Sequence, residues 1–176
     1  YLIDVEAQDV RQVLDYNNCS IDWQGRGQEL GLRGIAIDGQ TVYVVAGDEL
    51  FAFTPAFEII GSWRNPYLKY AEEVSIHERI LYVVSAGYDS VIAFELDERK
   101  FIRALHVDVD RFEFSGSIYD PMGEEGPILI NKLHLNSVHA NDDGLYICGL
   151  NTGGMLHFNG EAINMSVTLP EGTQNA

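Results

Sequence analysis

Five polar residues that open similar apolar segments carry the chemistry that this sequence offers. Alignment of three such segments places Arg33, Glu72 and Asn136 in one equivalent position, with Glu73 directly after Glu72 and His134 two residues before Asn136. Residues two apart share one side of a strand. Converging Asn, Glu and His side chains can bind a divalent cation, Ca²⁺ or Zn²⁺, or a polyhydroxylated ligand.

We therefore take Asn136, Glu72, Glu73 and His134 as candidate metal ligands, and Arg33 as a candidate ligand-binding residue. The positive charge of Arg33 would oppose a cation bound at the same place. The alternative interpretation needs no ligand: these side chains would form a polar ring that hydrogen-bonds strand ends and water.

The segments that position these residues belong to an internal repeat. The repeated unit is a short strand, a β-branched and aromatic strand, a turn containing glycine, a strand that ends in Phe and one further strand. Its central part recurs at 41–53, 80–94 and 145–158. Asp-Gly occurs at two of the turns, which is a strong hairpin signal. Four strands in about 40–50 residues is the period of a propeller blade.

The sequence therefore predicts an all-β fold, a β-propeller built of four-stranded antiparallel blades. A blade has two apolar faces and can bury both only by stacking between neighbours. This explains why Val42-Tyr43-Val44-Val45 and Leu81-Tyr82-Val83-Val84 are continuous apolar runs and not alternating ones.

The predicted domain is a single propeller of about three and a half blades over residues 1–176. Its parts are a half blade at 1–20, blades at 21–64, 65–107 and 133–168, an insertion at 108–132, and the start of an unfinished connection at 169–176. Propellers typically have four to eight blades. We therefore expect a chain that is part of a longer or processed product, with a ring completed by missing sequence or by a second chain.

The amino-acid composition restricts the kinds of partner that this chain can bind. The chain has 11 Lys and Arg against 27 Asp and Glu, a net charge of −16, whereas tracking a phosphate backbone needs a basic face. We expect no nucleic acid, and no membrane span because no apolar run is long enough. The prediction is a soluble protein, with the cytoplasm favoured over other compartments. Cys148 lies in an apolar run and is predicted to be a buried free thiol.

The phrase Asn136-Ser137-Val138-His139-Ala140-Asn141-Asp142-Asp143-Gly144-Leu145-Tyr146-Ile147 resembles a blade of the gluconolactonase and senescence-marker propellers, and more loosely of the NHL-repeat propellers. The His134-Leu135-Asn136 phrase with the closing residues 169–176 also looks like an uncharacterised bacterial propeller family. The first resemblance implies a metal-ligand role for Asn136. Ser137 stands where that family has Gly, and Arg33 and Glu72 occupy the equivalent positions of the other blades.

Two function classes remain open, and the sequence does not decide whether the chain is an enzyme. The first is a ligand-binding or protein-interaction module, favoured by the incomplete axial set and the lack of a catalytic motif. The alternative is a metal-dependent hydrolase or lactonase with its site at the mouth of the central channel. A carbohydrate-binding propeller would use Trp23, Trp63 or Tyr67 as stacking platforms, although packing between blades explains such aromatics equally well.

Overall fold

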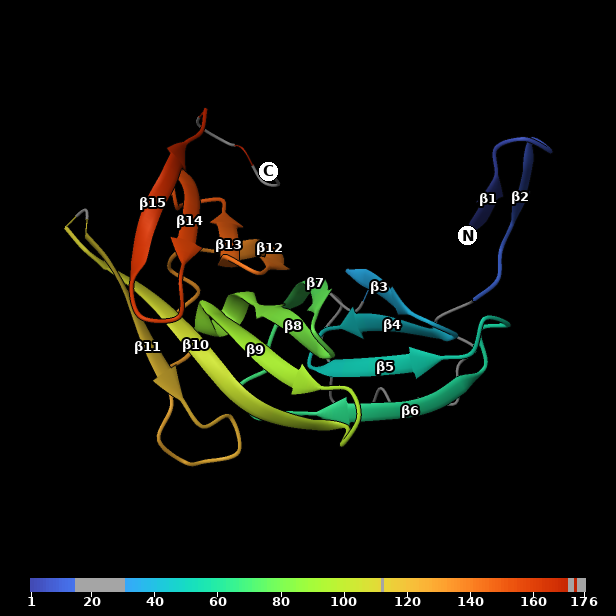
Figure 1. The fold of residues 1–176 in the computed structure, drawn as a ribbon, viewed down its shortest axis with the longest axis horizontal. Helices are drawn as coiled ribbons and strands as arrows, with labels where there is room; N and C mark the ends of the chain where they lie inside the picture. The colour runs from blue at the N-terminus through green and yellow to red at the C-terminus, as the bar shows by residue number, and fades with distance from the viewer. Residues whose placement is uncertain (15–30, 112, 171–172, 174–176) are drawn as a thin grey trace.

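The computed structural model describes residues 1–14, 31–111, 113–170 and 173. These residues form strands joined by turns, with one 3-10 turn at Ala86–Tyr88. Three antiparallel sheets fan out from a common centre, and a separate hairpin precedes them (Figure 1). None of the described residues belongs to a helix with the length and apolarity that crossing a bilayer requires. The architecture is that of a partial β-propeller.

The three sheets are the blades. The first blade has the strand order β3 (Ile35–Asp38), β4 (Thr41–Ala46), β5 (Glu49–Phe53), β6 (Ile59–Arg64). The second has the order β7 (Ala71–His77), β8 (Ile80–Ser85), β9 (Ser90–Glu95), β10 (Lys100–Asp110), β11 (Glu113–Tyr119). The third has the order β12 (Leu135–Asn141), β13 (Gly144–Gly149), β14 (Gly154–Phe158), β15 (Ile163–Thr168).

The innermost strands β3, β7 and β12 lie next to one another at the centre of the fan (Figure 1). The amide of Gly34 donates to the carbonyl of Glu72 at 2.6 Å, which joins the first blade to the second. The amide of Ala140 donates to Ser75 Oγ at 3.0 Å, which joins the second blade to the third. Polar residues at the ends of these strands therefore meet across blades.

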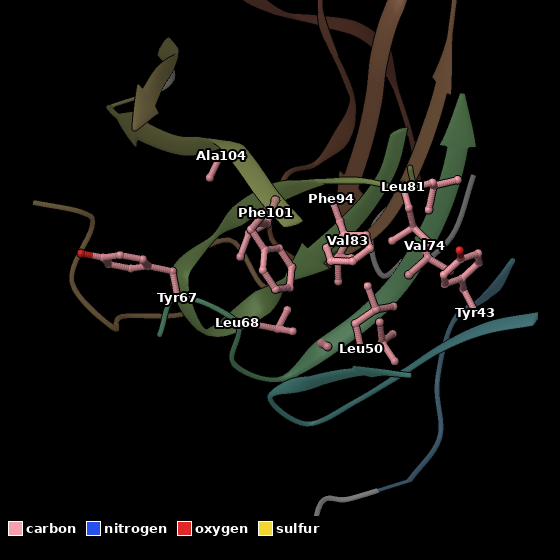
Figure 2. Close-up of a cluster of buried hydrophobic side chains, with 14 of the residues drawn as sticks. Tyr43, Leu50, Tyr67, Leu68, Val74, Leu81, Val83, Phe94, Phe101 and Ala104 are labelled. Atoms are coloured by element: carbon pink, nitrogen blue, oxygen red, sulfur yellow. The ribbon is translucent and has the colours of Figure 1, made fainter. Parts of the chain in front are cut away.

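The core lies between the blades. Leu50 and Val45 of the first blade and Val83 and Phe94 of the second are fully buried in one cluster. Figure 2 shows Leu50, Val83 and Phe94 gathered between the two sheets. The rings of Phe94 and Phe101 are 5.0 Å apart.

Strand β8 shows why the apolar runs are continuous. Leu81 and Val83 belong to the cluster shared with the first blade, whereas Val84 belongs to the cluster shared with the third. Successive residues of a strand point to opposite faces, so a strand covered on both faces needs apolar residues at every position. The expectation of stacked blades is confirmed for this strand.

The segment expected as an insertion at 108–132 begins as a sheet. Strand β10 continues to Asp110, and β11 pairs with it antiparallel as a fifth, outer strand of the second blade. Tyr119 packs edge-on against Tyr67 at 5.1 Å, and Phe114 packs against the core of the third blade. The following loop is held by Asp89, whose Oδ2 accepts the amides of Lys132 at 2.6 Å and Leu133 at 3.1 Å.

The first described residues form a hairpin of β1 (Leu2–Asp4) and β2 (Asp9–Arg11), whose strand residues are exposed. Residues 15–30, including Trp23, lie outside the described residues. The expected half blade at 1–20 and the start of the blade at 21–64 are therefore described only in part, and the half blade stays a prediction. Cys148, in contrast, is buried in β13, as its apolar surroundings predict.

Candidate functional site

Four of the five residues singled out from the sequence line one pocket. The pocket has a volume of about 440 Å³ and is lined by Arg33, Glu72, Glu73 and Asn136, together with Gly31, Leu32 and Gly34. We call this the axial pocket. It lies where the innermost strands of all three blades begin, so each blade contributes polar groups to it. The repeat alignment placed Arg33, Glu72 and Asn136 in one equivalent position, with Glu73 directly after Glu72, and all four residues line the same pocket.

Arg33 and Glu72 form an ion pair across the first two blades. Arg33 Nη1 donates to Glu72 Oε2 at 2.7 Å, with Glu72 the more buried partner. Their backbones are fixed as well, because the amide of Arg33 donates to the carbonyl of Val45 at 2.8 Å and the Gly34 amide to that of Glu72. The guanidinium is thus held at the pocket by a neighbouring carboxylate. A charged pair of this kind can recognise both donors and acceptors of a ligand.

Gly34 allows the first two blades to approach this closely. A Cβ at this position would lie 2.5 Å from the Glu73 Cα and 2.6 Å from the Val74 amide nitrogen. Carbon atoms in van der Waals contact are about 3.5–4.0 Å apart, so no side chain fits. Glycine here is a requirement of the site's geometry.

The pocket residues of the second and third blades lie at irregularities in their strands. The register of β7 against β8 shifts between Ala71 and Val74, and that of β12 against β13 shifts between Leu135 and Ser137. Glu72, Glu73 and Asn136 are therefore the residues at the shifts. Bulges turn side chains away from the regular alternation and are common beside binding sites. No pattern in the sequence indicates these bulges.

Asn136 contributes an acceptor without a partner. Its Oδ1 is buried and makes no hydrogen bond to any residue that the structure describes. A buried acceptor left unsatisfied costs about 1–3 kcal/mol. Such a group at a pocket is a natural place for a ligand donor or a cation.

His134 does not line the axial pocket. It directly precedes β12 in a left-handed conformation (φ 51°), and its Nδ1 lies 3.2 Å from Asn131 Nδ2. Its carbonyl accepts the amide of Leu150 at 3.1 Å. The structure thus shows a local role for His134 in the turn before β12, and its proposed role as a metal ligand stays a prediction.

The aromatic residues considered as sugar platforms pack against other aromatic side chains where they are described, with Trp63 half-buried and Tyr67 buried. Trp63 lies against Phe94, with ring centroids 5.0 Å apart, and Tyr67 is buried against Tyr88 and Tyr119. The packing interpretation is confirmed for Trp63 and Tyr67.

Comparisons with known proteins describe the shape of the chain only. No protein-family model matches it, and no curated protein matches its sequence. Among solved structures, it is similar to the computationally designed Ika4 protein, at 6% identity and a TM-score of 0.43, over 70% of this chain and 88% of that one.

Two other solved structures show a similar extent of likeness. The WD40 domain of Neurospora crassa Pan2 has 13% identity and a TM-score of 0.39, over 80% of this chain and 52% of that one. A catalytically inactive virginiamycin B lyase from Staphylococcus aureus with quinupristin has 8% identity and a TM-score of 0.45, over 80% and 56%. This chain thus spans about half the length of these two proteins, and nothing of their activity is transferred to it.

Proposed function

We propose that this chain is a propeller binding module whose axial pocket takes a small polyhydroxylated ligand. The observation that carries the proposal is the buried Oδ1 of Asn136, an acceptor that lacks a partner among the described residues and belongs to a residue that lines a pocket of about 440 Å³. A hydroxyl group of a ligand would satisfy this acceptor. The Arg33–Glu72 pair offers donors and acceptors to further hydroxyl groups beside it.

The electrostatics favour a neutral or mixed-charge ligand over a simple ion. Arg33 balances Glu72, and Glu73 adds one carboxylate to the same pocket. The guanidinium opposes a cation, and the carboxylates oppose an anion. A ligand with several hydroxyl groups meets neither obstacle, because hydroxyl groups both donate and accept hydrogen bonds.

Isothermal titration calorimetry with D-glucose, D-glucitol and D-glucono-1,5-lactone as probes tests the proposal. We expect millimolar or tighter binding of at least one probe, weakened about fivefold in Asn136→Ala, because a lost hydrogen bond is worth about 1 kcal/mol. The matched control is Glu161→Gln, an exposed residue in the turn between β14 and β15, which should bind like the wild type. Absence of binding for all three probes would refute the polyhydroxylated class.

A metal-dependent hydrolase or lactonase is the second candidate, and the same orphan acceptor favours it. The donor set fits a hard cation in part: Asn136 Oδ1 and the Glu73 carboxylate are oxygen ligands of the kind Ca²⁺ prefers. Arg33 is the feature that opposes it. A bound ion would supply Lewis-acid polarisation of a carbonyl, while Asn136 and Glu73 would hold and orient it.

Equilibrium dialysis with Ca²⁺, together with hydrolysis of D-glucono-1,5-lactone followed by pH-stat, tests this second candidate. Bound Ca²⁺ that disappears in Asn136→Ala, with hydrolysis abolished by chelator, would support it. A chain that retains no Ca²⁺ and hydrolyses no lactone above the uncatalysed rate would exclude this candidate and leave the binding module unaffected.

A further inference from the structure

A second group of polar side chains lies at the far ends of the innermost strands. His77 is the last residue of β7, Glu78 follows it in the turn to β8, and Asp142 lies in the turn between β12 and β13. Glu72 of the axial pocket and His77 are five residues apart on β7, which corresponds to about 16 Å along a strand. The two groups are therefore separate sites at opposite ends of the same strands.

The three side chains converge from two blades. His77 Nε2 lies 3.1 Å from Asp142 Oδ1, and one ligand atom from each of His77, Glu78 and Asp142 lies within 4.8 Å of the other two. Within the part of the chain that the structure describes, this is the one such group of three His, Cys, Asp or Glu residues. Ligands 2.1 Å from a tetrahedral Zn²⁺ are about 3.4 Å from one another. The observed spacing is thus close to what an ion would need.

The surroundings of this group form a negatively charged pocket. A volume of about 410 Å³ is lined by these three residues and by Asn141, Asp143 and Arg103, among others. Three carboxylates face one guanidinium, so a divalent cation is attracted on balance. One imidazole nitrogen with carboxylate oxygens suits Zn²⁺ and related divalent transition metals better than Ca²⁺ or Mg²⁺, which prefer oxygen alone.

We propose that His77, Glu78 and Asp142 form a binding site for a divalent transition metal, with Zn²⁺ as the ion of best-matched chemistry. The site offers three protein ligands and leaves a fourth position open to solvent. Because Asp142 comes from the third blade and the other two ligands from the second, the ion would join the turns of neighbouring blades. If the ion binds only the folded chain, the free energy of unfolding would rise with the logarithm of the metal concentration once that concentration exceeds the Kd.

The alternative is a simple ion pair between His77 and Asp142 with no metal. The matched pair Asp142→Asn and Asp143→Asn separates the two explanations. Both residues are acidic neighbours in one turn and line the same pocket, but only Asp142 belongs to the converging group. The Asp142 side chain is 92% exposed, so its substitution should leave the fold intact.

Calorimetric titration with Zn²⁺ tests the proposal, with excess Ca²⁺ present throughout to occupy sites made only of carboxylates. We expect the wild type to bind one Zn²⁺ per chain. The variants His77→Ala and Asp142→Asn should bind Zn²⁺ at least tenfold more weakly, whereas Asp143→Asn should bind it with unchanged affinity. Asn136→Ala should also bind Zn²⁺ normally, which separates this site from the axial pocket. Zn²⁺ should raise the melting temperature of the wild type and of Asp143→Asn but not of Asp142→Asn.

Two results would overturn the proposal: a wild-type chain without saturable Zn²⁺ binding, or equal Zn²⁺ affinities for Asp142→Asn and Asp143→Asn. Neither result bears on the polyhydroxylated ligand of the axial pocket, which is tested with other probes and other variants.

Discussion

The substitution Gly34→Ala tests how the first two blades are held together at the axial pocket. The added methyl group would meet backbone atoms, with the Glu73 Cα at 2.5 Å and the Val74 amide nitrogen at 2.6 Å. Backbone cannot rotate away as a flexible side chain can. The two innermost strands would have to part by about 1 Å before the new carbon reached ordinary contact.

This displacement has two costs. Forcing a methyl group into a packed site costs about 1–3 kcal/mol. The hydrogen bond from the Gly34 amide to the Glu72 carbonyl, now 2.6 Å, would also lengthen beyond useful range, at about 1 kcal/mol. We expect a total loss of about 3 kcal/mol in the free energy of unfolding. For a chain of this size, that is a fall of about 6–12 °C in melting temperature.

Gly31→Ala is the matched control, because a Cβ at Gly31 meets nothing within 4 Å. Both glycines line the axial pocket. The measurement is urea unfolding of both variants and the wild type, followed by circular dichroism and tryptophan fluorescence. Gly31→Ala should stay within about 0.5 kcal/mol of the wild type. Equal stabilities for the two variants would show that the close approach of the blades at Gly34 does not exist.

Four further predictions concern three contacts within the chain and the association of the chain with a second copy. Ser75→Ala removes the acceptor of the Ala140 amide at 3.0 Å and should lower the free energy of unfolding by about 1 kcal/mol in urea titrations; no loss would mean that this inter-blade bond is absent in solution. Asp89→Ala removes the acceptor of two backbone amides in the loop after β11; we expect a loss of about 3 kcal/mol and faster proteolysis within 120–132, both restored by Asp89→Asn, and unchanged cleavage would count against this anchor. The hydrogen bond from Lys132, with a second from the Val109 amide, lowers the pKa of Asp108, so its contribution is present above the usual carboxyl pKa of about 4 and is lost as the pH falls through the lowered value. The difference in unfolding free energy between wild type and Asp108→Asn should therefore shrink from pH 7 to pH 2, and a constant difference would refute this pairing. Finally, completion of the ring by a second chain predicts a mass above that of one chain in light scattering, and a stable monomer would contradict it.

The sequence was informative about structural features with a local physical cause, such as strands and hairpin turns. Strand segments such as Val42–Val45 and Leu81–Val84 could be recognised because both faces of a stacked blade are apolar, which produces continuous runs of β-branched and aromatic residues. Asp38-Gly39 marked a hairpin turn, and Gly39 indeed has a positive φ of 56°. The number of strands in the second blade was missed, because β11 is exposed and pairs on one edge only, so its residues show no strong apolar pattern.

The candidate site was predicted in part for a related reason. The repeat relates equivalent positions in different blades, which is why Arg33, Glu72 and Asn136 could be grouped without coordinates. It does not give the distance between blades, which the packing of their cores sets. The Arg33–Glu72 pair, the bulges beside Glu73 and Asn136, and the placement of His134 outside the pocket therefore required the structure.

The sequence by itself determined the class of fold, because strand pattern and repeat length follow from which residues must be covered by neighbouring blades. Only the tertiary structure decided which polar ends meet. His77 ends β7 and Asp142 lies in a turn of another blade, with no shared motif. Yet His77 Nε2 lies 3.1 Å from Asp142 Oδ1 because β7 and β12 run side by side along the axis. Contacts between turns of separate blades depend on the stacking angle and depth of whole sheets, and no short stretch of sequence carries that information.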